Sequence, residues 1–114
     1  MKPIWFDRVS APQVSIYDGG GVSSRMITKG GTGYERLGLH ISQGKAGLAG
    51  KASVVEGRDE IILILEGSMM VDAGDGPRTL GPEQGVVIPA GHPFDWAAGP
   101  DGWKAIIIYT PALV

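Results

Sequence analysis

The chain has 114 residues, which leaves room for one domain built around one hydrophobic core. Apolar residues make up 43% of it and charged residues 19%, a balance that excludes an intrinsically disordered chain. The formal net charge is −2, and the Lys and Arg residues are scattered singly. This distribution argues against nucleic acid and against an anionic membrane surface as partners.

The sequence has no cysteine, which excludes disulfides, thiolate metal ligands and cysteine nucleophiles. The first ten residues include Trp5, Asp7 and Arg8 and lack the apolar run and cleavage site of a signal peptide. The longest apolar run, residues 61–65, is far shorter than the roughly 20 residues of a membrane-spanning helix. We therefore predict a cytoplasmic protein with no membrane partner.

Nineteen Gly and eight Pro residues fall between short segments rich in Val, Ile, Leu, Thr and Tyr. This pattern predicts strands over residues 13–17, 22–28, 36–42, 51–56, 61–66, 68–72, 78–80, 85–88, 93–97 and 103–110. Gly and Pro predict turns at residues 18–21, 29–31, 73–76, 81–82, 89–91 and 99–102. No segment has a cap and uninterrupted helical spacing of apolar residues, so no substantial helix is expected. Short, evenly spaced strands favour an all-β barrel or jelly roll spanning residues 1–114.

Two polar residues in the first half of the chain are candidates for a binding site. His40 lies in the strand predicted over residues 36–42, on the opposite face from Leu39 and Ile41. It points into a pocket or into water, and it is either a substrate-binding residue or a hydrogen-bonded structural histidine. Arg25 suits bidentate binding of a carboxylate or phosphate, although a surface position is the simpler interpretation.

Two segments in the second half carry the most specific spacing. In residues 59–67, Asp-Glu-Ile-Ile-Leu-Ile-Leu-Glu-Gly, the glutamate Glu60 is followed after six residues by a turn glycine. In residues 85–91, Gly-Val-Val-Ile-Pro-Ala-Gly, a strand runs into a Pro-x-Gly turn, and Trp96 follows shortly after. The order and spacing resemble the two motifs of the cupin superfamily, in regions 50–67 and 85–96. The resemblance, which is to small cupins of the ethanolamine-utilisation type, implies a single cupin β-barrel, or double-stranded β-helix (jelly roll).

The metal ligands of the family are largely missing from this sequence. In the family, an H-x-H element before the motif Glu and a third His after the Pro-x-Gly turn hold a divalent metal. Here those three positions hold Val54, Glu56 and Phe94, so the usual three-His site is absent. Glu56, Glu60 and His92 offer two carboxylates and one imidazole, a set that zinc, manganese or nickel would accept. The cofactor is therefore unknown.

Two carboxylates are the candidate catalytic residues, Glu60 and Glu56. If they share a poorly solvated cavity they cannot both ionise cheaply, so one acts as acid and the other as base. This predicts an isomerase, epimerase or lyase acting by proton transfer on a small hydroxylated or carboxylated metabolite. Alternatively, both are solvated carboxylates beside the turn at residues 57–58, with Glu60 paired to Arg58 or Lys51, and the barrel binds or senses a ligand without catalysis.

The mouth of the barrel is predicted to carry further substrate-binding residues, His92, Asp95 and Trp96. A Trp at a pocket rim can stack on a sugar ring, and a core or dimer-interface position is the alternative. The resemblance also implies a homodimer, because small cupins pair through an N-terminal strand, here residues 14–17. The apolar residues 4–6 are expected to cover a barrel end or a partner.

Overall fold

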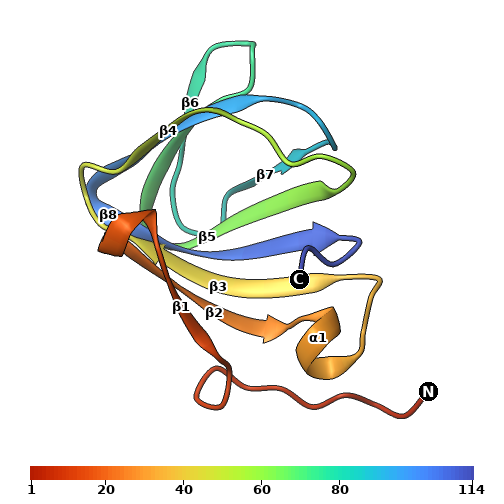
Figure 1. Cartoon of the computed structure of the whole chain (residues 1–114). Coiled ribbons are helices and arrows are strands. Elements are labelled where there is room, and N and C mark those ends of the chain that lie inside the picture. The colour runs from red at the N-terminus through yellow and green to blue at the C-terminus, as the bar shows by residue number, and fades with distance from the viewer.

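Short segments rich in β-branched residues, separated by glycine and proline, form strands throughout the chain. The computed structural model describes residues 1–114 and contains the following strands (Figure 1): β1 (Gln13–Ile16), β2 (Gly21–Ile27), β3 (Gly38–Gly44), β4 (Ala49–Ser53), β5 (Asp59–Asp72), β6 (Pro77–Leu80), β7 (Gly85–Ile88) and β8 (Phe94–Thr110). They form one antiparallel sheet in the order β1-β2-β3-β8-β5-β6, with β4 paired to β8 and β7 paired to β5. The predicted all-β barrel of jelly-roll type is confirmed.

The two longest strands, β5 and β8, each replace two predicted ones. The segments predicted at residues 61–66 and 68–72 form one strand, and so do those at 93–97 and 103–110. The turn predicted at residues 99–102 is therefore wrong, because the chain continues through β8 there. Ten predicted strands become eight, and β5 and β8 pair with each other along most of their length.

Two glycines explain why β5 and β8 bend instead of reversing. Gly67 and Gly102 both have φ of +72°, a left-handed conformation that other residues avoid. A Cβ atom on Gly67 would collide with the backbone of Gly102, so the two strands approach closely only because Gly67 has no side chain. The pairing of β5 with β8 shifts register on both sides of Gly67. The strands curve around the barrel at this point.

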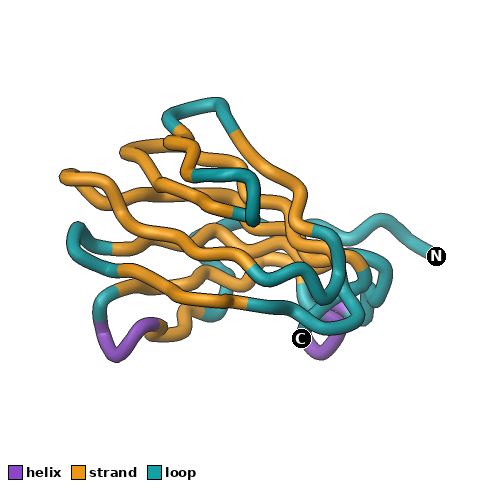
Figure 2. Tube along the Cα trace, turned by 90° about the horizontal axis from the view of Figure 1, so that it is seen from above, coloured by secondary structure: helices purple, strands orange, loops and turns teal.

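The only helical segments are short, as predicted. The 3₁₀ turn η1 (Tyr17–Gly19) and the single-turn α1 (Lys29–Thr32) both fall where turns were predicted. Thr28 caps α1, because its Oγ1 accepts a hydrogen bond from the N–H of Gly31 at 2.9 Å. Figure 2 shows the two segments at opposite ends of the strands. Neither is long enough or apolar enough to cross a membrane.

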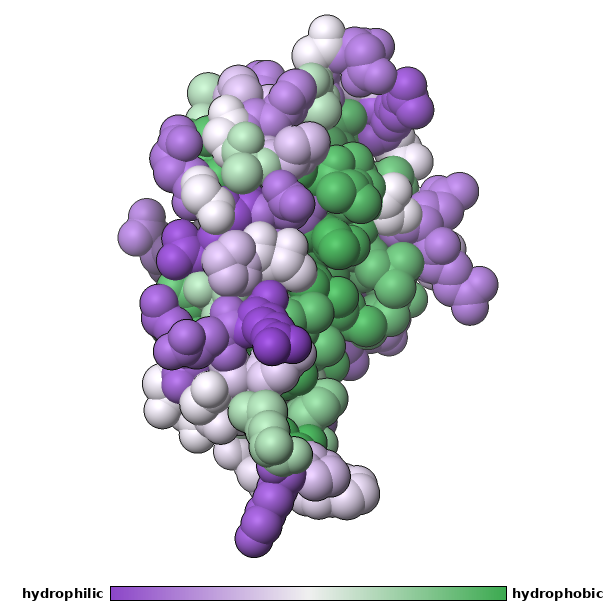
Figure 3. Space-filling view, turned by 90° about the vertical axis from the view of Figure 1, so that its right-hand side faces the viewer, coloured by the Kyte–Doolittle hydropathy of each residue, from purple (hydrophilic) through white to green (hydrophobic).

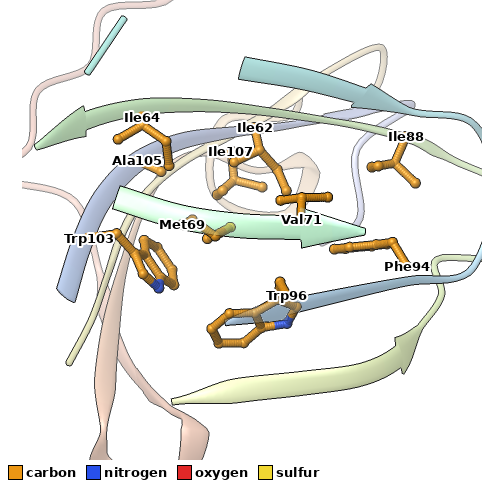
Figure 4. Close-up of a cluster of buried hydrophobic side chains, with 10 residues drawn as sticks. All are labelled: Ile62, Ile64, Met69, Val71, Ile88, Phe94, Trp96, Trp103, Ala105 and Ile107. Carbon is orange, nitrogen blue, oxygen red and sulfur yellow. The ribbon is translucent and has the colours of Figure 1, made fainter. Parts of the chain in front are cut away.

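The hydrophobic core lies on the inner side of the long strands. Its ten buried residues, drawn in Figure 4, are Ile62, Ile64, Met69, Val71, Ile88, Phe94, Trp96, Trp103, Ala105 and Ile107. All of them come from β5, β7 and β8. Strands β2 and β3 line the same interior but contribute no residue to this cluster, and their inward side chains are polar.

Candidate functional site

A cavity of about 150 Å³ lies inside the barrel, between the polar strands β2 and β3 and the apolar strands β5 and β8. Its polar lining residues are Tyr17, Ser23, Arg25, His40, Ser42, Glu60 and Tyr109. A wider depression of about 650 Å³ on the surface beside residues 19–21 is lined by five glycines among twelve residues and has no buried titratable side chain. The smaller cavity is the candidate site, because it collects the buried titratable groups of the chain.

Strand register brings the polar side chains together. On β2 and β3, Arg25 is paired with His40, and Ser23 is paired with Ser42, whose hydroxyl donates to that of Ser23 at 3.2 Å. Residues two apart on a strand point to the same face, so all four side chains face the interior. On β5 and β8, Glu60 is paired with Tyr109.

Glu60 is a buried carboxyl group, with 8% of its surface exposed. Burial raises its pKa, because the charged form is poorly solvated, and a hydrogen bond from the Tyr109 hydroxyl at 3.5 Å partly opposes this rise. Burial and the neighbouring Glu60 raise the pKa of Tyr109 in turn. The predicted pairing of Glu60 with Arg58 or Lys51 is wrong: Arg58 donates to backbone carbonyls and Lys51 pairs with Asp95.

His40 is buried beside Tyr109, whose hydroxyl donates to Glu60. Its ring packs edge-on against Tyr109, with the ring centroids 5.3 Å apart, and its Nε2 atom has no hydrogen-bond partner. Burial, with a further effect of the nearby Arg25 cation, lowers the pKa of His40 to about 4. The imidazole is therefore neutral at physiological pH. Of the two positions considered for His40, the structure places it in the pocket.

Arg25 lines the cavity instead of lying on the surface, so the simpler interpretation of the sequence is wrong. Its Nε atom is buried without a hydrogen-bond partner. The ion pairs of the chain are Lys51 with Asp95, Arg78 with Asp75 and Lys104 with Glu66, and none involves Arg25. The cavity thus contains a cation that forms no ion pair with a carboxylate of the protein.

Three aromatic rings form the opposite part of the lining. Trp96 and Trp103 are buried and pack edge to face, with centroids 5.8 Å apart. The ring of Tyr17, which is 44% exposed, lies 5.1 Å from that of Trp96. Trp96 was predicted either at a pocket rim or in the core, and it both lines the cavity and belongs to the core. The sequence analysis did not single out Tyr17, Trp103 or Tyr109.

Three predicted site residues lie outside the cavity. His92 is exposed, and its Nε2 lies 2.7 Å from the carbonyl oxygen of Ala73. It precedes β8 in an irregular segment, so the alternation that suggested an inward position does not apply. Asp95 accepts a hydrogen bond from the N–H of Ala52 at 2.8 Å, which lowers the pKa of its carboxyl group, and it pairs with Lys51.

Glu56 is the third residue outside, exposed in the turn before β5. It does not share the cavity with Glu60, so the two glutamates do not form an acid–base pair. The ligand set Glu56, Glu60 and His92 is also not assembled, and no group of three or more His, Asp or Glu side chains converges. At the family's other ligand positions, Val54 is 45% exposed and the apolar Phe94 lines the cavity. The residues present do not fit the family's metal.

Neither a protein-family model nor a curated protein matches this sequence. Its fold is similar to that of KdgF from a Halomonas species, with a TM-score of 0.82 and 16% identity over 96% of this chain and 94% of that one. A sugar phosphate isomerase of the cupin superfamily from Silicibacter pomeroyi gives a TM-score of 0.76 and 18% identity, over 96% and 76% of the two chains. An oxalate decarboxylase from Bacillus subtilis gives 0.81 and 16%, over 96% and 29%. This chain therefore has the fold of a small cupin, a single β-barrel.

Proposed function

We propose that the cavity binds a small hydroxylated or carboxylated metabolite and that Glu60 transfers a proton to or from it, in a reaction of the isomerase, epimerase or lyase type. The buried Glu60 carboxyl group that lines the cavity carries this proposal. A carboxylate that is poorly solvated is a stronger base than one in water, and burial raises the pKa of Glu60 accordingly. Two structural neighbours are named for an isomerase and a decarboxylase, which supports chemistry on small oxygenated molecules.

The neighbouring residues supply the remaining roles. Glu60 removes a proton from a carbon beside a carbonyl group, and negative charge develops on the substrate oxygen. His40, whose Nε2 has no hydrogen-bond partner in the protein, stabilises that oxygen as a donor, because donors held in a water-poor cavity act strongly on developing charge. The Tyr109 hydroxyl donates a hydrogen bond that orients the Glu60 carboxylate, and the protonated Glu60 then returns the proton to the same or a neighbouring carbon of the substrate. Glu56 and His92 take no part, since they lie outside the cavity.

Deuterium exchange tests the proposal without knowledge of the natural substrate. The protein is incubated in D₂O with dihydroxyacetone, glyceraldehyde, lactate, pyruvate and 2-oxobutyrate, and loss of C–H signals is followed by proton NMR. We expect catalysed exchange for at least one compound, and loss of that exchange in Glu60→Gln with the fold intact. The matched control is Glu66→Gln, on the same strand but paired with Lys104 outside the cavity. Wild-type exchange in Glu60→Gln contradicts the proposal.

A non-catalytic binding or sensing barrel is the second candidate. Val54 and Phe94, at two of the family's ligand positions, favour it because neither can hold a metal or carry a proton. In that case calorimetry detects binding of a compound that shows no exchange, and Glu60→Gln binds it as well as the wild type does.

A further inference from the structure

Three buried polar side-chain atoms in the chain have no hydrogen-bond partner, and all three belong to residues that line the cavity. They are Nε of Arg25, Nε2 of His40 and Nε1 of Trp103. A buried polar group without a partner costs free energy, so native proteins contain few of them. Of the three residues, Arg25 also forms no ion pair, so the cavity wall carries a charge that a ligand can compensate.

The chemistry of the three atoms defines what the ligand must offer. Nε of Arg25 and Nε1 of Trp103 carry hydrogen atoms and act only as donors. The neutral imidazole of His40 donates from Nε2 in the tautomer that has its proton there. A ligand that hydrogen-bonds to Arg25 and His40 must therefore present acceptor oxygens. A neutral hydroxyl or carbonyl group would satisfy hydrogen bonds but would leave the charge of Arg25 uncompensated.

We propose that Arg25 recognises the carboxylate of a small monocarboxylic acid. This inference rests on the proposed function, because it names the ligand class of the same cavity. Arginine binds carboxylates in a planar, two-point geometry, and charge-assisted hydrogen bonds are stronger than neutral ones. The Glu60 carboxyl group in the same cavity disfavours a dianion such as a phosphate ester, since its ionised form would repel the second negative charge.

Cavity size and lining define the remainder of the ligand. Ile62, Met69, Phe94, Trp96 and Ile107 form an apolar part of the wall. A cavity of about 150 Å³ has the size of an apolar protein cavity that holds benzene. The ligand thus has about six non-hydrogen atoms, with a short carbon chain on the apolar wall and its carboxylate at Arg25. Small 2-oxo and 2-hydroxy acids fit this description.

Binding of matched acids and amides tests the inference by calorimetry or NMR titration. The probes are pyruvate against pyruvamide and lactate against lactamide, with methyl phosphate as the competing anion. We expect each acid to bind about tenfold or more tightly than its amide, because only the acid carries the charge. Equal binding of acid and amide, or tighter binding of methyl phosphate, overturns the inference. This comparison needs only the wild-type protein.

Variants at Arg25 add a second test. Arg25→Met should weaken binding of the acids by about tenfold to a hundredfold, and Arg25→Lys should restore part of the loss. Arg78→Met is the control, since Arg78 is exposed and pairs with Asp75 outside the cavity. Unchanged binding in Arg25→Met contradicts the inference.

The two proposals fail in different ways. If acids bind through Arg25 but show no deuterium exchange, the carboxylate site is supported and proton transfer by Glu60 is contradicted. If exchange requires Glu60 but proceeds equally in Arg25→Met and on dihydroxyacetone, proton transfer is supported and the carboxylate site is contradicted.

Discussion

The two halves of the barrel wall differ sharply in the side chains that they turn inward. Strands β2 and β3 contribute Ser23, Arg25, His40 and Ser42, whereas the paired positions on β5 and β8 hold Ile62, Ile64, Ala105 and Ile107. All eight lie on one continuous sheet. The apolar half supplies the burial that stabilises the fold, and the polar half gives up part of that stabilisation.

The outer side of the same sheet carries apolar side chains across β3, β8, β5 and β7 alike. Leu39, Ile108, Ile61 and Val87 lie side by side across β3, β8, β5 and β7, with Ile41, Ile106 and Leu63 in the next row. Leu63 is 36% exposed and Val87 is 60% exposed. Figure 3 shows hydrophobic atoms gathered in a band on one side of the molecule, bordered by hydrophilic residues. Large exposed apolar patches of this kind mark interaction surfaces.

The two halves should differ most in how much one substitution in each lowers the free energy of unfolding. Ile64 has no exposed surface, so Ile64→Ala should lower the free energy of unfolding by about 2–5 kcal/mol. Ser42→Ala removes only the hydrogen bond to Ser23 and should cost about 1 kcal/mol. Urea denaturation measures both values. Equal losses at the two positions would show that the polar half contributes as much to stability as the apolar half.

Lowering the pH should weaken the polar half selectively. The pKa of His40 is about 4 in the folded chain against an ordinary 6.5, so the unfolded chain takes up a proton first. Stability should therefore fall by about 1–3 kcal/mol between pH 6.5 and pH 4, and His40→Gln should abolish this fall. The raised pKa of Glu60 has the opposite effect on stability. The protonated Glu60 favours the folded chain at low pH, and this contribution to the free energy of unfolding is lost as the pH rises above 4.5.

A clean measurement of the His40 effect uses chemical denaturation in a Glu60→Gln background at several pH values. The other titratable groups of the cavity, Tyr17 and Tyr109, have raised pKa values and do not change charge in this range. The same pH dependence with and without His40 would show that the imidazole is protonated as easily in the folded chain as in the unfolded one.

A substitution on the outer face should have the smallest effect on stability and a larger effect on assembly. The homodimer expected from the sequence stays a prediction, and we propose that a second copy packs on this face, which has no charged residue in its two apolar rows. Leu63→Lys should change the unfolding free energy by less than about 1 kcal/mol but convert a dimer to a monomer in sedimentation. Thr79→Lys, on the exposed β6, is the control. A dimer that survives Leu63→Lys but not removal of residues 1–6 would place the interface at the N-terminal segment.

Much of the fold was predictable because its signals are local. Glycine and proline mark most of the chain reversals, and the spacing around Glu60 and the Pro-x-Gly turn predicts the barrel type. The number of strands was not predictable. Whether the chain turns or only bends at Gly67 depends on its close approach to Gly102, which lies 35 residues away along the chain and is visible only once β5 and β8 pair.

The lining of the cavity was predictable only where strand alternation applies. Glu60, His40 and Trp96 line it, whereas Glu56 and His92 lie in irregular segments where alternation has no meaning. The same alternation, followed inward from the core along β8, would have found Tyr109. The position of Arg25 could not be found this way, because an arginine on a short strand is most often a surface residue.

The three tryptophans of the chain also differ in a way that makes the cavity observable by light. Trp5 is 90% exposed, whereas Trp96 and Trp103 are almost fully buried and both line the cavity. In Trp5→Phe, all remaining indole fluorescence would therefore originate from the cavity wall. A ligand that enters the cavity changes the surroundings of these two indoles directly. Occupancy can then be followed from the emission of the protein itself, without a label and without knowledge of the reaction.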